Sequence, residues 1–60
     1  MGIWRSPDGY EVEAIILDGR QVLRVSRIYG DRRVVRGYCR DVAELAGLGV
    51  DLGALVEEPA

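Results

Sequence analysis

Histidine and lysine are absent from this sequence, and cysteine occurs only once, as Cys39. Without histidine or lysine, the chain lacks the side chains that most often act as a base near neutral pH. One cysteine cannot form an internal disulfide, and a lone thiol without histidine cannot build a zinc site. These absences argue against an enzyme, and we predict a non-catalytic protein that needs no metal or other cofactor.

Long apolar segments are absent as well. No apolar run approaches the ~18 residues that a membrane span requires, and residues 1–7 lack the apolar stretch of a signal peptide. All eight basic residues are arginine, and the many glycines, alanines and valines beside them are typical of high-GC bacterial genomes. We therefore expect a cytoplasmic bacterial protein that makes no membrane contact.

The 60 residues of the chain allow a single domain of marginal stability. Domains of this size usually depend on a disulfide, a metal or a partner subunit. Because the sequence excludes the first two, we expect self-association and predict a homodimer. Within the domain, residues 1–9 are expected to form a strand and a turn, residues 10–39 a β-meander, and residues 41–58 a helical segment.

The strongest local pattern is the pair Asp18-Gly19 between two runs rich in β-branched residues. This pair is typical of a two-residue type I′ loop and predicts a β-hairpin over residues 10–29. A two-residue loop determines the register, and a slip of one residue would break every favourable pair. The expected opposite pairs include Leu17 with Arg20, Ile15 with Val22, Ala14 with Leu23, Glu13 with Arg24, and Val12 with Val25.

The register assigns the hairpin side chains to two faces. One face is almost wholly apolar and is expected to form the core: Tyr10, Val12, Ala14, Ile16, Leu23 and Val25. The other face carries charges at one end and, at the turn end, the apolar residues Ile15, Leu17 and Val22. Such a patch is too apolar to face water alone, so we predict that a partner binds there. Tyr38 is a further candidate contact, and Trp4 either joins that interface or covers the core.

A second turn at residues 29–32 leads into a third strand over residues 33–39. A three-residue loop would place Val35, Gly37 and Cys39 on the core face, whereas a two-residue loop would place Val34, Arg36 and Tyr38 there. We favour the three-residue loop because it keeps Arg36 out of the core. Upstream, the sequence Ser-Pro-Asp-Gly at residues 6–9 is typical of a turn, so residues 3–5 are expected to add a short strand.

After residue 39 the pattern becomes helical. Asp41 and Glu44 form a capping box, and Gly47 and Gly49 are expected to end this helix. Asp51 is expected to cap a second short helix over residues 52–57. The sequence therefore predicts an α+β fold: an antiparallel meander of three or four strands, followed by one or two short C-terminal helices packed on one sheet face.

Seven of the eight arginines fall within residues 19–40, where the only acid is Asp31. They suggest an alternative function, nucleic-acid binding through an arginine-rich sheet face. The candidate residues are Arg20, Arg24, Arg32, Arg33 and Arg36. The net charge of −2 opposes this function, because nucleic-acid-binding domains are usually basic. Pairing with nearby acids would also account for these arginines.

Four short features are shared with a known family: the Tyr10-x-Val12-x-Ala14 pattern, the Asp18-Gly19 turn, the Gly37-Tyr38 strand end and the acidic-apolar helix over residues 41–46. On these features residues 10–57 resemble a HicB-type antitoxin domain, which has a partial RNase H-like fold. The resemblance implies dimerisation and a small toxin as partner, and it assigns no functional residues. We predict a homodimeric protein-interaction module with a regulatory or antitoxin-like role.

Overall fold

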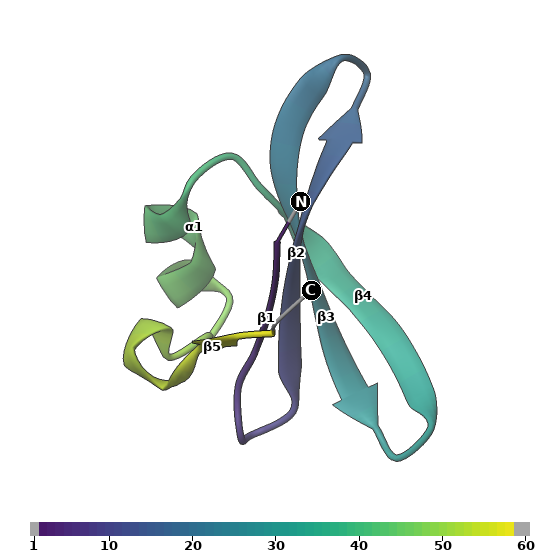
Figure 1. Ribbon diagram of the computed structural model, residues 1–60, viewed down its shortest axis with the longest axis vertical. Helices are drawn as coiled ribbons and strands as arrows, with labels where there is room; N and C mark the ends of the chain where they lie inside the picture. Colours follow the sequence, from purple (N-terminus) through teal and green to yellow (C-terminus); the bar gives the residue numbers. More distant parts are fainter. Residues whose placement is uncertain (1, 59–60) are drawn as a thin grey trace.

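A computed structural model of the chain describes residues 2–58 and shows one antiparallel sheet with the strand order β4-β3-β2-β1-β5 (Figure 1). The strands are β1 (Ile3–Arg5), β2 (Tyr10–Leu17), β3 (Arg20–Tyr29), β4 (Arg32–Cys39) and β5 (Val56–Glu57). One α-helix, α1 (Val42–Gly47), and one 3-10 turn, η1 (Leu52–Ala54), lie beside the sheet. Neither of these helical segments of residues 2–58 is long and apolar enough to cross a membrane.

The α+β fold class is wrong, because strands dominate the described residues and only one short helix forms. The second helix expected over residues 52–57 is instead the single turn η1 followed by β5. Gly53 lies in the middle of η1, and glycine disfavours helix. The edge of β1 offers unpaired backbone groups, and the Glu58 N–H donates to the Ile3 carbonyl at 2.8 Å. The C-terminal segment therefore extends the sheet instead of adding a helical layer.

The β2–β3 hairpin has the predicted register. Its pairs include Leu17 opposite Arg20 and Ile15 opposite Val22, and they continue without a break to the far end of β2. Asp18 has φ 52° and Gly19 has φ 76°, so both central residues take the positive φ that a type I′ turn requires. Local turn chemistry alone therefore determined which side chains share a face.

The β3–β4 turn differs from the expected three-residue loop. Tyr29 pairs with Arg32, so that only Gly30 and Asp31 form the loop. Gly30 has φ 64°, which suits the first central position of a type II′ turn. Further along, one extra residue enters β4 as a β-bulge between the pair Ser26–Val35 and the pair Val25–Gly37.

The bulge decides which face each β4 side chain takes. The prediction for Val35 is wrong, because the two-residue loop places it opposite Ser26 on the second sheet face. Beyond the bulge the alternation is reset, and Gly37 and Cys39 pair with the core-face residues of β3, as predicted. Arg36 is the extra residue and stays exposed, so the core avoids its charge without a longer loop.

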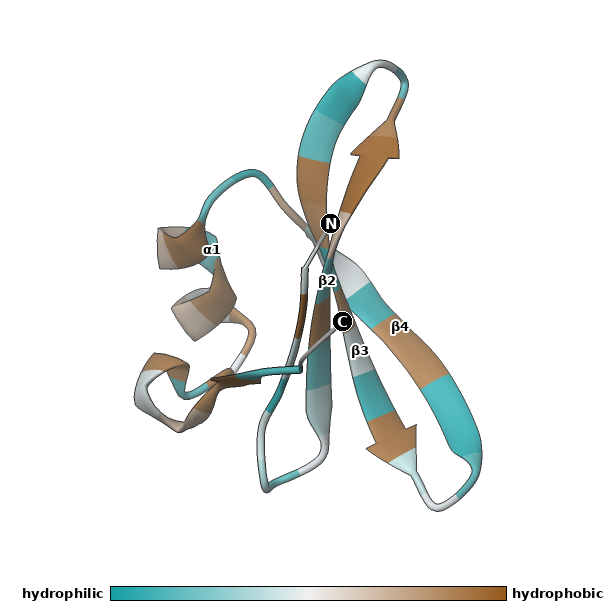
Figure 2. Cartoon of the chain, in the orientation of Figure 1, coloured by the Kyte–Doolittle hydropathy of each residue, from teal (hydrophilic) through white to brown (hydrophobic). Residues whose placement is uncertain are grey.

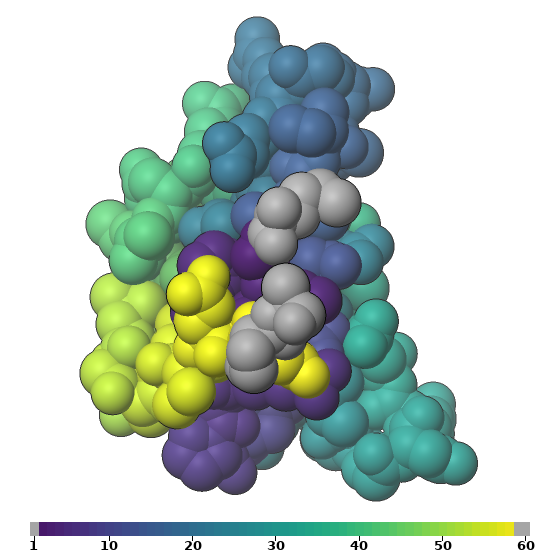
Figure 3. Space-filling model, in the orientation of Figure 1, coloured from purple at the N-terminus to yellow at the C-terminus, as the bar shows by residue number. Residues whose placement is uncertain are grey.

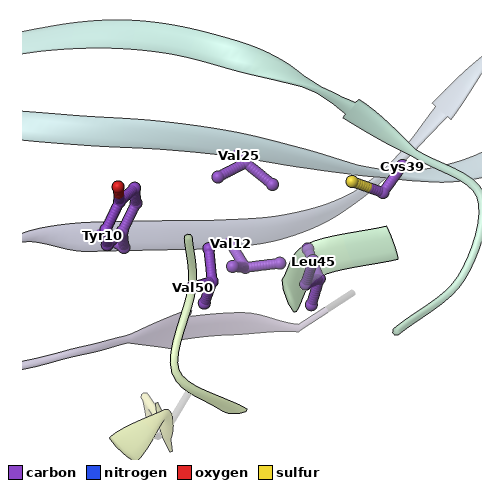
Figure 4. Close-up of a cluster of buried hydrophobic side chains, with 6 residues drawn as sticks. All are labelled: Tyr10, Val12, Val25, Cys39, Leu45 and Val50. Carbon is purple, nitrogen blue, oxygen red and sulfur yellow. The ribbon is translucent and has the colours of Figure 1, made fainter. Parts of the chain in front are cut away.

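The core lies between the sheet and α1 together with the chain that follows it (Figure 4). Its buried members are Tyr10, Val12, Val25, Cys39, Leu45 and Val50. Ile16 was expected in this core and is instead 65% exposed. A six-residue helix is about 9 Å long, whereas eight strand residues span about 27 Å. The helical cover is therefore too short to reach the end of the β2–β3 hairpin (Figure 1).

Two further local predictions are confirmed. Residues 3–5 form β1 and pair with β2, and the turn between them ends at Gly9 with φ 94°. Asp41 caps α1, because its Oδ1 accepts the Glu44 N–H at 3.2 Å. The Glu44 carboxylate in turn accepts the backbone N–H of Arg40 at 3.4 Å, which completes the capping box one residue before its usual position.

Candidate interaction surfaces

The free end of the β2–β3 hairpin carries apolar side chains on both faces, and we call Ile15, Ile16, Leu17 and Val22 the hairpin tip. Ile15 and Val22 lie directly opposite one another and are half-buried, and Leu17 is 44% exposed on the same face. Ile16 points to the other face. Figure 2 shows the hydrophobic colouring at the end of β2, and Figure 3 shows that this end projects beyond the rest of the molecule. The tip therefore exposes apolar surface in two directions.

The other two predicted partner contacts lie apart from the tip. Tyr38 is opposite Arg24 on the second face and is half exposed, two strands away from Leu17. Trp4 lies opposite Val12 on the core face and packs against the buried cluster. Sequence analysis did not identify Ile16 as a candidate contact. Ile16 alternates with the core residues of β2 and was therefore expected in the core, and this pattern does not reveal that α1 is too short to cover it.

An apolar groove of about 300 Å³ opens between the core face and the C-terminal segment. Its lining includes Trp4, Leu23, Val42, Leu52 and Leu55. Leu23 lies on β3 close to the hairpin tip, and Val42, at the start of α1, is more than half exposed. The groove therefore extends the apolar surface of the tip across the core face.

The centre of the second face holds a buried carboxylate, that of Glu11, whose side chain is 4% exposed. One of its oxygens lies 3.2 Å from Nε of Arg5, and the other lies 3.0 Å from a terminal nitrogen of Arg33. Arg5 also pairs with Glu58 at 3.0 Å. Beside this cluster, Arg24 forms an ion pair with Glu13, as the hairpin register predicted. The charges of this face therefore largely neutralise one another.

These ion pairs bear on the five arginines that suggested nucleic-acid binding. Arg24 and Arg33 are engaged by carboxylates. The other three form no ion pair within residues 2–58, and they lie in two places: Arg32 and Arg36 are on the edge strand β4, whereas Arg20 is apart from them beside the β2–β3 turn. They do not form one cationic face, so nucleic-acid binding stays a prediction that the charge arrangement weakens.

Cys39, the one candidate nucleophile, is buried at the end of β4. Burial raises the pKa of its thiol above the ordinary value, and the nearby carboxylates of Glu44 and Asp41 raise this pKa further. A nucleophilic cysteine needs the opposite shift. Cys39 therefore serves as a small apolar core residue.

The raised thiol pKa has a consequence for stability. The native state retains the Cys39 proton at alkaline pH values at which the unfolded chain loses it. We therefore expect the free energy of unfolding to fall as pH rises above about 8.5, the ordinary thiol pKa, towards the higher folded-state value. Urea titrations between pH 7 and pH 10 check this, and a Cys39→Ala variant should show a smaller decline. An equal decline in both proteins would assign the effect to other groups.

The residues described, 2–58, contain no group of three or more His, Cys, Asp or Glu side chains placed to hold a metal ion. In comparisons with protein-family models, with curated proteins and with solved structures, no match was found for this chain. Function must therefore be argued from the surfaces alone.

Proposed function

We propose that this protein is a non-catalytic protein-interaction module that forms a homodimer through the hairpin tip and the adjoining apolar groove. The observation that carries the proposal is the exposure of Ile16 and Leu17 on opposite faces of one projecting hairpin. A domain of this size gains stability from a partner subunit, because its own core is small.

The composition of this surface suits a permanent subunit contact. The hairpin tip is apolar; Asp18 and Arg20 adjoin it at the turn, and the ion pair Glu13–Arg24 follows it on the second face. Charged residues are depleted from the centres of protein interfaces. The ion pairs of Glu11 and Glu13 lie further down the second face, beyond the apolar residues of the tip. The tip therefore forms the centre of the proposed contact, and the charged clusters lie outside it.

The partner class has one further support. The resemblance to HicB-type antitoxin domains suggests a small toxin as a second partner of the dimer, with the complex acting in the bacterial cytoplasm. This part of the proposal is separate from self-association, and co-expression with the product of an adjacent gene tests it. A neighbouring product that arrests growth and is neutralised by this chain would support it, and the absence of such a gene would remove it.

The dimer is tested by making the tip polar while keeping its β propensity. In a double variant, Ile16→Thr with Leu17→Thr, we expect the dimer dissociation constant to rise by roughly 30-fold or more. Burying two such apolar side chains contributes about 1.5–3 kcal/mol each, and threonine retains part of this. Sedimentation equilibrium between 1 and 500 µM measures the change.

A matched control is Val56→Thr, which changes another exposed β-branched residue, 68% exposed, on the distant strand β5. It should leave the dissociation constant unchanged. Both variants should retain the monomer fold, because exposed substitutions usually change stability by less than about 0.5 kcal/mol. A wild-type protein that stays monomeric at 500 µM would refute the proposed dimer.

A further inference from the structure

β4 forms one edge of the sheet, and it is the long edge. It has eight residues, of which only Gly37 and Cys39 are not exposed. The opposite edge, β5, has two residues. A strand edge displays backbone N–H and C=O groups that a further strand can pair with.

The alternation of the β3–β4 ladder identifies which groups are free. The pair that closes a two-residue hairpin, here Tyr29 with Arg32, exchanges both hydrogen bonds, and bonded and non-bonded pairs alternate from there. The backbone groups of Arg33 and Val35 therefore point away from β3. Among residues 2–58, no turn, loop or cap hydrogen bond engages them.

The side chains of this edge are cationic and apolar. Arg32 and Arg33 precede the pair Val34-Val35 and Arg36 follows it; all five are exposed, and the strand contains no acid. Arg33 already pairs with a carboxylate within the chain, because it lies 3.0 Å from Glu11 while about half of its side chain stays exposed. The edge therefore combines free backbone groups with a charge that favours carboxylates.

A second copy of β4 is a poor occupant of this edge. An antiparallel pair with its two-fold axis at Val34 would set Arg32 of each copy opposite Arg36 of the other, and an axis at Arg33 would set that residue against itself. Like charges directly opposite one another destabilise a strand pair. With the axis at Val35, the two bulged residues would enter the shared ladder and disrupt it. Charges and bulges on an edge thus oppose self-pairing, but the charges attract an acidic strand.

We propose that β4 is the docking edge for an extended acidic segment of another protein, which adds to the sheet as a sixth strand. Its backbone would pair with Arg33 and Val35, and its carboxylates would lie beside the arginines while its β-branched residues cover the two valines. The inference goes beyond the proposed homodimer and does not rest on it, because the hairpin tip is a separate surface.

The probe is a ten-residue capped peptide in which glutamate alternates with valine and threonine. Amide hydrogen exchange of the full chain, followed by NMR, should slow at least tenfold at Arg33 and Val35 when the peptide saturates the edge. The amide of Val34 already bonds to β3 and is the internal reference. No slowing at Arg33 and Val35 with 2 mM peptide would overturn the proposal.

Two altered peptides separate charge from backbone pairing. The same sequence with lysine for glutamate, and a glutamate peptide with N-methyl groups on alternate residues, should each bind at least tenfold more weakly. Equal binding of either peptide would overturn the proposal. A Val35→Pro variant removes one outward N–H without breaking the β3–β4 ladder and should also abolish binding. Self-association should be unchanged by the peptide, so the two surfaces are tested independently.

Discussion

Replacing Glu11 with lysine is expected to unfold the domain or bring it close to unfolding at room temperature. The substitution removes the carboxylate that pairs with Arg5 and Arg33, and it places a third cation in a site where the side chain is 4% exposed. Removing one partner of a buried charge cluster costs about 3–5 kcal/mol. The two arginines are about half exposed, so water can solvate them once the carboxylate is gone. We therefore expect the free energy of unfolding to fall by about 3 kcal/mol, the low end of this range.

A loss of that size is comparable with the entire stability of such a small domain, about 3–5 kcal/mol. Far-UV circular dichroism in urea measures it. The matched control is Glu57→Lys, which makes the same change of charge on the exposed edge strand β5, where Glu57 forms no ion pair within residues 2–58. If Glu11→Lys and the control unfold at the same urea concentration, the buried ion-pair cluster contributes nothing to stability.

Replacing Val25 with alanine is expected to lower the free energy of unfolding by about 2 kcal/mol. Val25 is 0% exposed and lies at the centre of the sheet, opposite Val12 on one side and Gly37 on the other. Removing its methyl groups loses their transfer free energy and leaves a cavity that the surrounding strands fill only partly. The melting temperature should fall by about 8–16 °C, because each kcal/mol shifts it by about 4–8 °C in a domain of this size.

Val56→Ala makes the same chemical change at a residue that is 68% exposed, and it should shift the melting temperature by only a few degrees. Thermal melts followed by circular dichroism compare the two variants at equal protein concentration, because the melting temperature of a dimer depends on concentration. Similar shifts in the two variants would contradict the assignment of Val25 to the core.

The β2–β3 hairpin shows how far local chemistry reaches. Asp18 and Gly19 can form a type I′ turn, and a two-residue turn leaves only one register. The pair Glu13–Arg24 and the shared face of Ile15, Leu17 and Val22 therefore follow from sequence alone. The second turn shows the limit. Gly30 permits a two-residue loop, and the expectation of a longer loop arose from keeping Arg36 out of the core, a problem that the bulge solves instead.

The candidate surfaces divide in the same way. Ile15, Leu17 and Val22 could be named from alternation, whereas the exposure of Ile16 depends on the length of α1 relative to the hairpin. The residues near Glu11 in the sequence do not predict that its side chain is buried. It requires Arg5 from β1 and Arg33 from β4 to arrive from opposite sides, and these strands are brought together only by the sheet.

By itself, the sequence determined the features that depend on neighbours a few residues apart: the hairpin register, the cap of α1, the N-terminal strand and the absence of histidine, lysine and a disulfide. Tertiary structure decided what depends on competition between distant segments. Residues 56–57 form β5 because pairing with the open edge of β1 is more favourable than a short helix that contains glycine. The same competition left β4 as the open edge, because the described chain supplies no other strand to cover it.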